Sequence, residues 1–480
     1  MSKLNRDVLY LIFEELQDDK KTLYSCLLTN KIYCEIIIPI LWRNPWYQLH
    51  PGNEKSLLNV IISHLSNGSK NKLRNQGLNF SDTLNQKPLF DYISYCKHLN
   101  LIAIFKIVDN VYSILRKPIP MIKAEIITLF INSNTKFTHL YIPRMHNCLI
   151  PRTNHLFSGL VFLNCSTATD KDVLSLLKRI CQSIKELDLT IEKSKNNPAG
   201  IAGIVRLIEG QKKLIKVNFN VINVKNSELS CKVLENSLVK HANTIQHFRI
   251  TKPPVTKILS SFVNLKCLEL DNFFIEKWNC LEDLSLPLLQ NLRASRVPIN
   301  ALTNLIKNTD GHLTEIKIDY VSHNNKIENK NIIRAIHQNC PNLKYLKLTI
   351  RNDNILELEK LLIICKHLNG LVILIDNTDV LFGWDNLFKI LINSSPIGLF
   401  KFKFWLDSPN RTIDLESLRF FFDNWKKRPS MLLQIIQMMR NENIDNLIKK
   451  YKAEGIVAKY DNDYDYDHWN GSSLDNFEWV

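Results

Sequence analysis

Residues 340–348 read CPNLKYLKL, and this stretch decides the fold class. Its apolar residues follow a fixed spacing, with two variable residues between Leu343 and Leu346 and one between Leu346 and Leu348. The alternating second half is typical of a short strand that buries one face. The same spacing occurs eleven times along the chain, and the repeats begin at Phe137, Phe157, Ile184, Leu214, Ile245, Leu265, Leu289, Leu313, Leu343, Leu368 and Leu399.

The eleven repeats begin 20 to 31 residues apart. Between them lie segments of helical character, for example 172–181, 331–340 and 355–365. One strand and one helix cannot bury an apolar side alone, so neighbouring repeats must stack into a continuous core. We therefore predict an α/β fold, an irregular solenoid with a parallel sheet on its inner face. A generic α/β protein with parallel strands is the alternative.

The repeat length and spacing resemble those of leucine-rich repeats. Residues 340–348 closely resemble the repeats of F-box/leucine-rich-repeat proteins. The Asn or Cys that this family places three residues beyond the last apolar position occurs only at Cys165. Such a side chain would satisfy backbone groups of the following loop, so its absence elsewhere predicts irregular repeats.

The N-terminal 46 residues read as three short helices with apolar faces. Helices of this size cannot bury much surface alone, so they need the rest of the chain, a partner, or both. Their apolar stripes consist of Leu4, Val8, Leu9, Ile12, Phe13 and Leu16, of Leu23, Leu27 and Leu28, and of Ile32, Ile36 and Ile37.

This N-terminal pattern resembles the F-box, the docking module of cullin-RING ubiquitin ligases. Asn5 stands where the family has Pro, and an Asn can cap the first helix instead. The end of the segment resembles the end of the motif in large fungal F-box families. The matching positions are Leu4, Asp7, Val8, Leu9 and Ile12, then Leu23, Leu27 and Leu28, then Thr29, Asn30 and Tyr33, and finally Leu41, Trp42 and Arg43.

The resemblance implies a non-catalytic substrate-recognition subunit of an SCF-type ubiquitin ligase. Its partners would be a Skp-type adaptor and, through the adaptor, a cullin and a RING protein. The solenoid would bind the target protein that is to be ubiquitinated. The adaptor contacts that the resemblance implies are Leu4, Val8, Leu9, Ile12, Leu23 and Leu27.

The remaining sequence suggests how the chain is divided. Residues 49–134 read as mostly helical, with helices expected at 55–65, 88–99, 101–115 and 121–131 and a polar loop at 66–79. Helices are also expected at 415–428 and 430–451. The predicted domains are an F-box-like domain at 1–48, a helical linker and cap at 49–134, the solenoid at 135–428, a C-terminal capping helix at 429–458 and a disordered acidic, aromatic tail at 459–480.

The inner face of the predicted solenoid is basic towards its C-terminal end. The chain carries a net charge of +15, and the variable residue between the last two apolar positions of each repeat points out of the sheet. From Arg249 onward five of these seven residues are basic, and like charges stacked on neighbouring strands repel each other. We hypothesise that an acidic or phosphorylated substrate segment binds there. The proposed substrate-binding residues are Arg249, Arg293, Lys317, Lys347 and Lys403.

A different interpretation of these lysines also stands. Their ammonium groups would extend into water, with Glu269, Glu315 and Asp319 as local counter-ions. Two further functions remain open for the chain. One is an interaction scaffold that is not tied to a ligase, and the other is a basic solenoid that binds nucleic acid. The lysines are spread along the chain and form no basic arm, so we do not expect nucleic acid as the partner.

Sequence motifs of catalysis are missing. The chain has no GxGxxG, Walker, HExxH or GxSxG motif and no His pair at metal-ligand spacing. Its eleven cysteines form no CxxC motif, so we expect reduced thiols and neither cofactor nor metal. No apolar run reaches membrane-spanning length, and the N-terminus lacks the apolar core of a signal peptide. We therefore expect a cytoplasmic or nuclear protein without a membrane partner.

Overall fold

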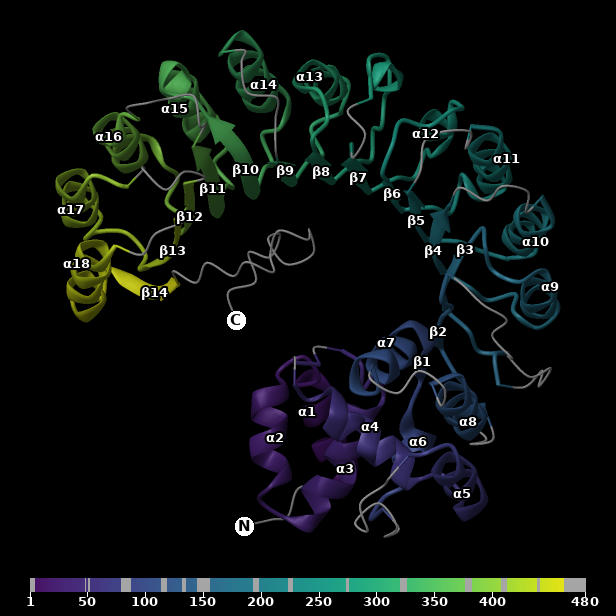
Figure 1. The fold of residues 1–480 in the computed structure, drawn as a ribbon. Coiled ribbons are helices and arrows are strands. Elements are labelled where there is room, and N and C mark those ends of the chain that lie inside the picture. Colours follow the sequence, from purple (N-terminus) through teal and green to yellow (C-terminus); the bar gives the residue numbers. More distant parts are fainter. Residues whose placement is uncertain are drawn as a thin grey trace. The chain divides into compact units, whose positions relative to one another are not determined.

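The structure is a computed structural model. It describes residues 5–47, 49–50, 52–78, 88–113, 119–131, 135–144, 156–192, 198–222, 228–272, 276–319, 326–375, 382–406, 412–437 and 441–461. These residues contain eighteen α-helices and an all-parallel sheet of fourteen strands, which pair in chain order from β1 to β14 (Figure 1). The predicted α/β fold with a parallel, solenoid-like sheet is thereby confirmed.

The chain divides into two compact units. Unit 1 comprises Met1–Val217 and Ile222–Leu238, and unit 2 comprises Asn218–Val221 and Val239–Val480. Strand β5, Lys216–Val221, lies at the boundary between them. None of the helices in the described ranges combines the length and the apolar character needed to cross a bilayer.

Unit 1 begins with three short helices, α1 (Arg6–Glu15), α2 (Lys20–Leu27) and α3 (Lys31–Trp42), which we call the helical module. A polar side chain caps each N-terminus. The side-chain oxygen of Asn5 accepts from the Asp7 N–H at 3.4 Å, Asp19 accepts from Thr22 N–H, and Asn30 accepts from Tyr33 N–H. The predicted capping role of Asn5 is confirmed, and the three caps satisfy N–H groups that have no partner inside their helices.

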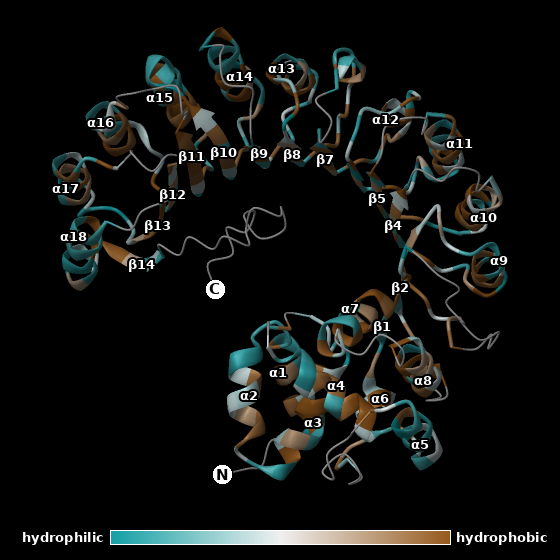
Figure 2. Ribbon diagram, in the orientation of Figure 1, coloured by the Kyte–Doolittle hydropathy of each residue, from teal (hydrophilic) through white to brown (hydrophobic). Residues whose placement is uncertain are grey.

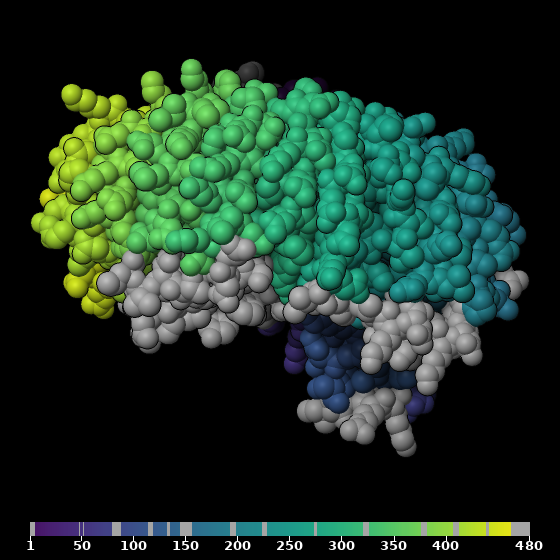
Figure 3. All heavy atoms as spheres, turned by 90° about the horizontal axis from the view of Figure 1, so that it is seen from above, coloured from purple at the N-terminus to yellow at the C-terminus, as the bar shows by residue number. Residues whose placement is uncertain are grey.

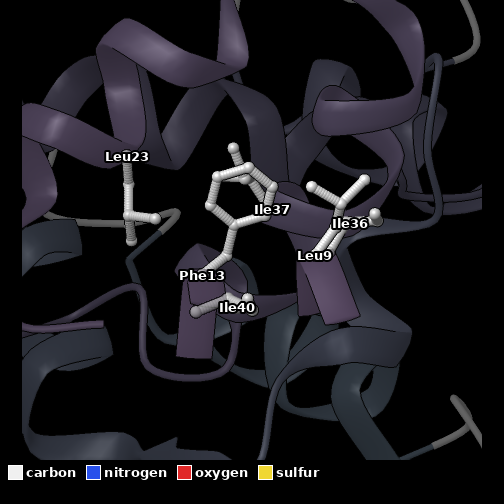
Figure 4. Close-up of a cluster of buried hydrophobic side chains, with 6 residues drawn as sticks. All are labelled: Leu9, Phe13, Leu23, Ile36, Ile37 and Ile40. Carbon is white, nitrogen blue, oxygen red and sulfur yellow. The ribbon is translucent and has the colours of Figure 1, made fainter. Parts of the chain in front are cut away.

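A single apolar cluster holds the helical module together (Figure 4). Leu16, Cys26, Leu27, Tyr33 and Leu41 pack against it from its margin. The cluster draws residues from all three helices, so the module has a core of its own. Its buried members are Leu9, Phe13, Leu23, Ile36, Ile37 and Ile40.

The segment after the helical module differs from the prediction in two places. The expected polar loop at 66–79 contains a helix, α5, because Ser66 caps it and Leu73 is fully buried beneath it. The expected helix at 88–99 is mostly absent, and its end forms strand β1. The elements of this region are α4 (Glu54–Ser63), α5 (Asn67–Asn75), α6 (Tyr92–Tyr95), β1 (His98–Asn100), α7 (Leu101–Val111) and α8 (Ile119–Ile131).

Strand β1 belongs to the repeat series although the sequence analysis missed it. Cys96, Leu99 and Leu101 have the spacing of the other repeats, and all three are fully buried. The sheet therefore starts before residue 135, the predicted beginning of the solenoid. The other elements of unit 1 are β2 (His139–Tyr141), β3 (Phe162–Ser166), α9 (Lys171–Ile180), β4 (Glu186–Ile191), α10 (Pro198–Glu209) and α11 (Glu228–Leu238).

Strand β3 is shifted by three residues from its prediction. The repeat expected to begin at Phe157 instead uses Leu160, Leu163 and Cys165, and Leu163 pairs with Leu140 and Leu187. The residue that points out of the sheet in this strand is Asn164, whereas the repeat predicted from Phe157 has Val161 as its outward residue. Cys165 is an inward, buried strand residue, so the prediction that it serves as the family's loop residue is wrong.

Unit 2 repeats a strand followed by a helix, with a continuous register. In the space-filling view its repeats follow one another in chain order (Figure 3). Its elements are β6 (His247–Ile250), α12 (Ile258–Ser261), β7 (Cys267–Asp271), β8 (Asn291–Ser295), α13 (Ile299–Lys307), β9 (Glu315–Asp319), α14 (Lys326–Asn339), β10 (Tyr345–Ile350), α15 (Ile355–Ile364), β11 (Gly370–Ile375), α16 (Trp384–Ser394), β12 (Lys401–Leu406), α17 (Leu415–Asn424), β13 (Met431–Gln437), α18 (Glu442–Ala453) and β14 (Val457–Asp461).

Aromatic side chains fill the C-terminal half of the unit 2 core. The ring of Phe421 in α17 lies 4.8 Å from that of Phe388 and 5.2 Å from that of Trp425. Phe402 of β12 meets Trp425 edge to face at 5.3 Å. Helices α13–α17 carry both hydrophilic and hydrophobic residues (Figure 2), as expected where one side of each helix packs on the sheet.

The C-terminal region corrects a further prediction. Residues 430–451 were expected to form one capping helix, but they form strand β13 followed by helix α18. Met431, Leu433 and Ile435 are buried at every second position, which is the period of a strand. The sheet then continues through β14, so it extends beyond residue 428 and includes the first residues of the predicted tail. Residues 462–480 lie outside the described residues.

Candidate functional site

The predicted adaptor contacts divide into buried and exposed residues. Leu23 is 0% and Leu9 is 8% exposed, and both belong to the core of the helical module. Leu27 is half-buried and packs against the same core. Val8 and Ile12 are exposed on α1. Leu4 lies outside the described residues. The side chains of Leu9 and Leu23 therefore support the surface of the module and do not form it.

The helical module also exposes apolar residues that the sequence analysis did not select. Leu11 is 63% and Leu28 is 84% exposed. Leu11 shares a face of α1 with Val8 and Ile12, since residues three and four positions apart lie side by side on a helix. The second strip lies on α2 and the start of α3. We call these two strips the apolar strips, and they consist of Val8, Leu11 and Ile12, and of Tyr24, Leu28 and Ile32.

Polar contacts fix α1 against α3. The Arg43 guanidinium donates to Glu14 Oε1 at 2.7 Å and to the Tyr10 hydroxyl at 3.2 Å. The hydrogen bond from Arg43 lowers the pKa of the Glu14 carboxyl, which stays ionised near neutral pH. At the other end of α1, Arg6 lies 3.3 Å from Glu35. The apolar strip on α1 is thus presented by a helix that is held at both ends.

The helical module covers the first edge of the sheet. The Arg43 carbonyl accepts hydrogen bonds from the N–H groups of Lys97 at 2.9 Å and His98 at 3.2 Å. The Lys97 carbonyl accepts in the same way from Thr138 and His139 one repeat later. The Trp46 indole N–H adds a bond to the His98 carbonyl at 2.8 Å. The end of α3 therefore takes the place of a preceding repeat, and the edge of β1 is protected.

The residues predicted to bind substrate lie in one row across the strands of unit 2. Arg293, Lys317 and Lys347 stand at paired register positions, so their predicted alignment is confirmed. We call this line the charged row. In strand order it contains Arg249, Glu269, Arg293, Lys317, Lys347, Val372, Lys403, Gln434 and Asp461.

Acidic neighbours neutralise the first half of the charged row. Arg293 lies 3.1 Å from Glu315 and 3.7 Å from Glu269, and Lys317 lies 3.2 Å from Glu315. Lys347 pairs with Asp319 at 2.5 Å. The local counter-ions expected as the alternative are therefore present.

The lysines of the charged row do not extend into water as that alternative supposed. Lys317 and Lys347 are only 5% and 2% exposed. A buried ammonium group requires anionic partners or hydrogen-bond acceptors. Repulsion between stacked cations, the original reason for expecting an external anion, is therefore relieved within the fold at β8–β10.

The second half of the row has a different composition. Strands β10–β13 contain no acidic residue. The Lys401 ammonium lies 5.6 Å from the centre of the Tyr345 ring, and the Lys403 ammonium lies 5.8 Å from that of Trp405. We call these four residues the basic–aromatic patch, in which Lys403 is buried and the other three are half-buried. Tyr345, Lys401 and Trp405 were not among the predicted substrate-binding residues, although they occupy the other outward positions of the same strands.

Catalytic features are scarce in the described part of the chain. No three His, Cys, Asp or Glu side chains there lie close enough together to hold a metal ion. His98 and His139 stack at 3.7 Å, and burial lowers the pKa of His98 to about 4, so its ring is neutral at pH 7. Burial raises the pKa of the Cys181 and Cys365 thiols to about 12, which makes these thiols poor nucleophiles.

Two surfaces therefore remain as candidates, the apolar strips of the helical module and the basic–aromatic patch of unit 2. The first is suited to a hydrophobic partner and the second to an acidic one. No known protein-family model matches the chain, and no curated protein matches it either.

Proposed function

We propose that this protein is the substrate-recognition subunit of an SCF-type ubiquitin ligase. The helical module docks a Skp-type adaptor, and the adaptor connects it to a cullin and a RING protein. The strand face of the repeats holds the target protein. The observation that carries the proposal is the exposure of apolar residues on a module whose own core is already complete.

The proposed adaptor contacts differ from those predicted from the sequence, because only exposed side chains can touch a partner. Val8 and Ile12 stay among the contacts, and Leu11, Tyr24, Leu28 and Ile32 join them because their side chains are exposed. Leu9 and Leu23 act indirectly, by holding the helices in place. Leu4 stays a prediction, since it lies outside the described residues.

The proposed contribution to ubiquitination is positional. A receptor that holds a target beside a charged ubiquitin-conjugating enzyme raises the local concentration of substrate lysines, and this requires no catalytic group of its own. Continuity between the helical module and the sheet supports such a role. The hydrogen bonds from Lys97 and His98 to the Arg43 carbonyl join the docking module directly to the first strand.

The test is a pull-down of the purified full-length protein with a Skp-type adaptor. The variant Leu11→Asp/Leu28→Asp places a charge on each apolar strip. Burying one Leu contributes roughly 1.5–3 kcal/mol, so the double variant should bind at least about a hundredfold more weakly. Leu356→Asp is the matched control, because Leu356 is also an exposed Leu but lies on α15. Circular dichroism checks that all variants are folded.

The outcomes separate the candidate functions. Binding lost only in the double variant supports the ligase receptor. Absence of binding by the folded wild type would favour an interaction scaffold instead. Nucleic-acid binding would be recognised by an affinity that falls steeply with salt. The pairing of Arg293 and Lys317 with Glu315 weakens the positive field that such binding needs.

A further inference from the structure

The basic–aromatic patch lies next to the point where the described chain ends. Asp461 is the last residue of β14 and the last member of the charged row. The Gln434 side-chain amide donates to Asp461 Oδ2 at 3.1 Å. The chain therefore leaves the sheet on the same row that carries Lys403 and Lys347, within unit 2.

The sequence that follows complements this patch in charge and in ring content. Residues 462–480 read NDYDYDHWNGSSLDNFEWV, with five acids and neither Lys nor Arg. We call them the acidic tail. In an extended conformation Asp463, Asp465 and Asp467 would point to one side, while Tyr464 and Tyr466 would point to the other. A peptide of this kind presents carboxylates to lysines and rings to aromatic side chains at the same time.

The acidic tail is long enough to reach the patch. Adjacent parallel strands lie about 4.8 Å apart, so β10 is about 19 Å from β14 across the sheet. The nineteen residues 462–480 span up to about 60 Å when extended. The same spacing places β12, which carries Lys401 and Lys403, about 10 Å from β14.

We propose that the acidic tail binds in cis to the basic–aromatic patch and competes there with an acidic, aromatic segment of a partner protein. The partner segment is a substrate only if the proposed ligase function holds, but the intramolecular contact does not depend on it. Carboxylates of the tail bind Lys401, which lies two residues from the buried Lys403, and the rings of the tail pack against Tyr345 and Trp405.

The competition has a predictable size. A tethered segment has an effective concentration of millimolar order. If the tail peptide binds the patch with a Kd of about 100 µM as a separate molecule, the tethered copy weakens an external peptide about tenfold. Both affinities should fall with added salt, because they rest largely on charge.

The experiment uses a fluorescein-labelled synthetic peptide of residues 462–480 and fluorescence anisotropy. The full-length variant Asp463→Asn/Asp465→Asn/Asp467→Asn should bind this peptide about tenfold more tightly than the wild type, because its own tail competes less. Adding Lys401→Glu to that variant should abolish the gain, and Lys401→Gln should reduce it by an intermediate amount. Lys449→Glu, an exposed lysine on α18, is the matched control and should leave the affinity unchanged.

Two results would overturn the proposal. One is equal peptide affinity for the wild type and the Asn variant, and the other is binding that Lys401→Glu leaves intact in a protein with an unchanged melting temperature. Neither result involves the adaptor. The adaptor pull-down tests the ligase proposal alone, and the peptide experiment tests the tail proposal alone. The two proposals can therefore fail independently.

Discussion

Leu23 and Leu28 provide a sharp test of the division between core and surface in the helical module. They are five residues apart, Leu23 within α2 and Leu28 at its C-terminal cap, yet Leu23 is 0% and Leu28 is 84% exposed. Leu23→Ala removes buried methyl groups from a packed cluster, which costs about 2–4 kcal/mol. Leu28→Ala removes atoms that already contact water, and the expected change in stability is below about 0.5 kcal/mol.

Hydrogen exchange measured by mass spectrometry suits this comparison, because it follows the module alone in a chain of two units. A loss of 2–4 kcal/mol from the local opening free energy accelerates amide exchange in α2 and α3 by about 30- to 700-fold. Leu23→Ala should show that acceleration, whereas Leu28→Ala should exchange like the wild type. At a temperature where both variants are folded, Leu28→Ala should weaken adaptor binding more than Leu23→Ala does. Equal acceleration by the two substitutions would contradict the assignment of Leu28 to the surface.

Two further predictions concern titratable groups in the repeats. Glu357 lies 2.9 Å from Arg334, and the hydrogen bond from Arg334 lowers the pKa of the Glu357 carboxyl. The pair therefore stabilises the fold fully at a pH above the ordinary Glu pKa. This stabilisation is lost as the pH falls through the lowered pKa. Glu357→Gln should lower the free energy of unfolding at pH 7 by about 1–3 kcal/mol and remove that acid-dependent loss, as thermal melts at pH 7 and pH 4 would reveal. His98 has a folded pKa of about 4, so the unfolded chain binds the extra proton and stability should fall as the pH drops from about 6.5 towards 4. His98→Gln should flatten this part of a melting-temperature profile, and an unchanged slope would assign it to other groups.

The repeats could be predicted from sequence because their spacing ties each strand to a buried partner on both sides. The strand beginning at Lys401 is an example, since Phe402 and Phe404 repeat the inward positions of Leu371 and Ile373. Prediction failed where two patterns overlap. Around residue 160, repeats beginning at Phe157 and at Leu160 both satisfy the spacing, and only the pairing of Leu163 with Leu187 selects the second.

The interior of the helical module shows a different limit. Leu9 and Ile12 both lie on apolar positions of one short helix, and the sequence offers no rule for which of them faces inward. The choice depends on α3, because Phe13 packs edge to face against Tyr33 at 5.1 Å and Leu9 belongs to the same buried cluster as Ile36 and Ile37. Periodicity identifies an apolar helix, but burial is decided by contacts with residues far away in the chain.

The charged row shows that the charge of a sheet face cannot be predicted from a single outward residue of each strand. When only the central outward position of each strand is considered, Arg293, Lys317 and Lys347 are stacked cations. The flanking outward positions carry Glu315 and Asp319, which pair with those cations across neighbouring strands. Strands β11–β13, which include Lys401 and Lys403 of β12 and both neighbours of that strand, contain no acidic residue. Recognition of an acidic partner is therefore expected at the C-terminal end of the sheet, beside the strand from which the acidic tail departs.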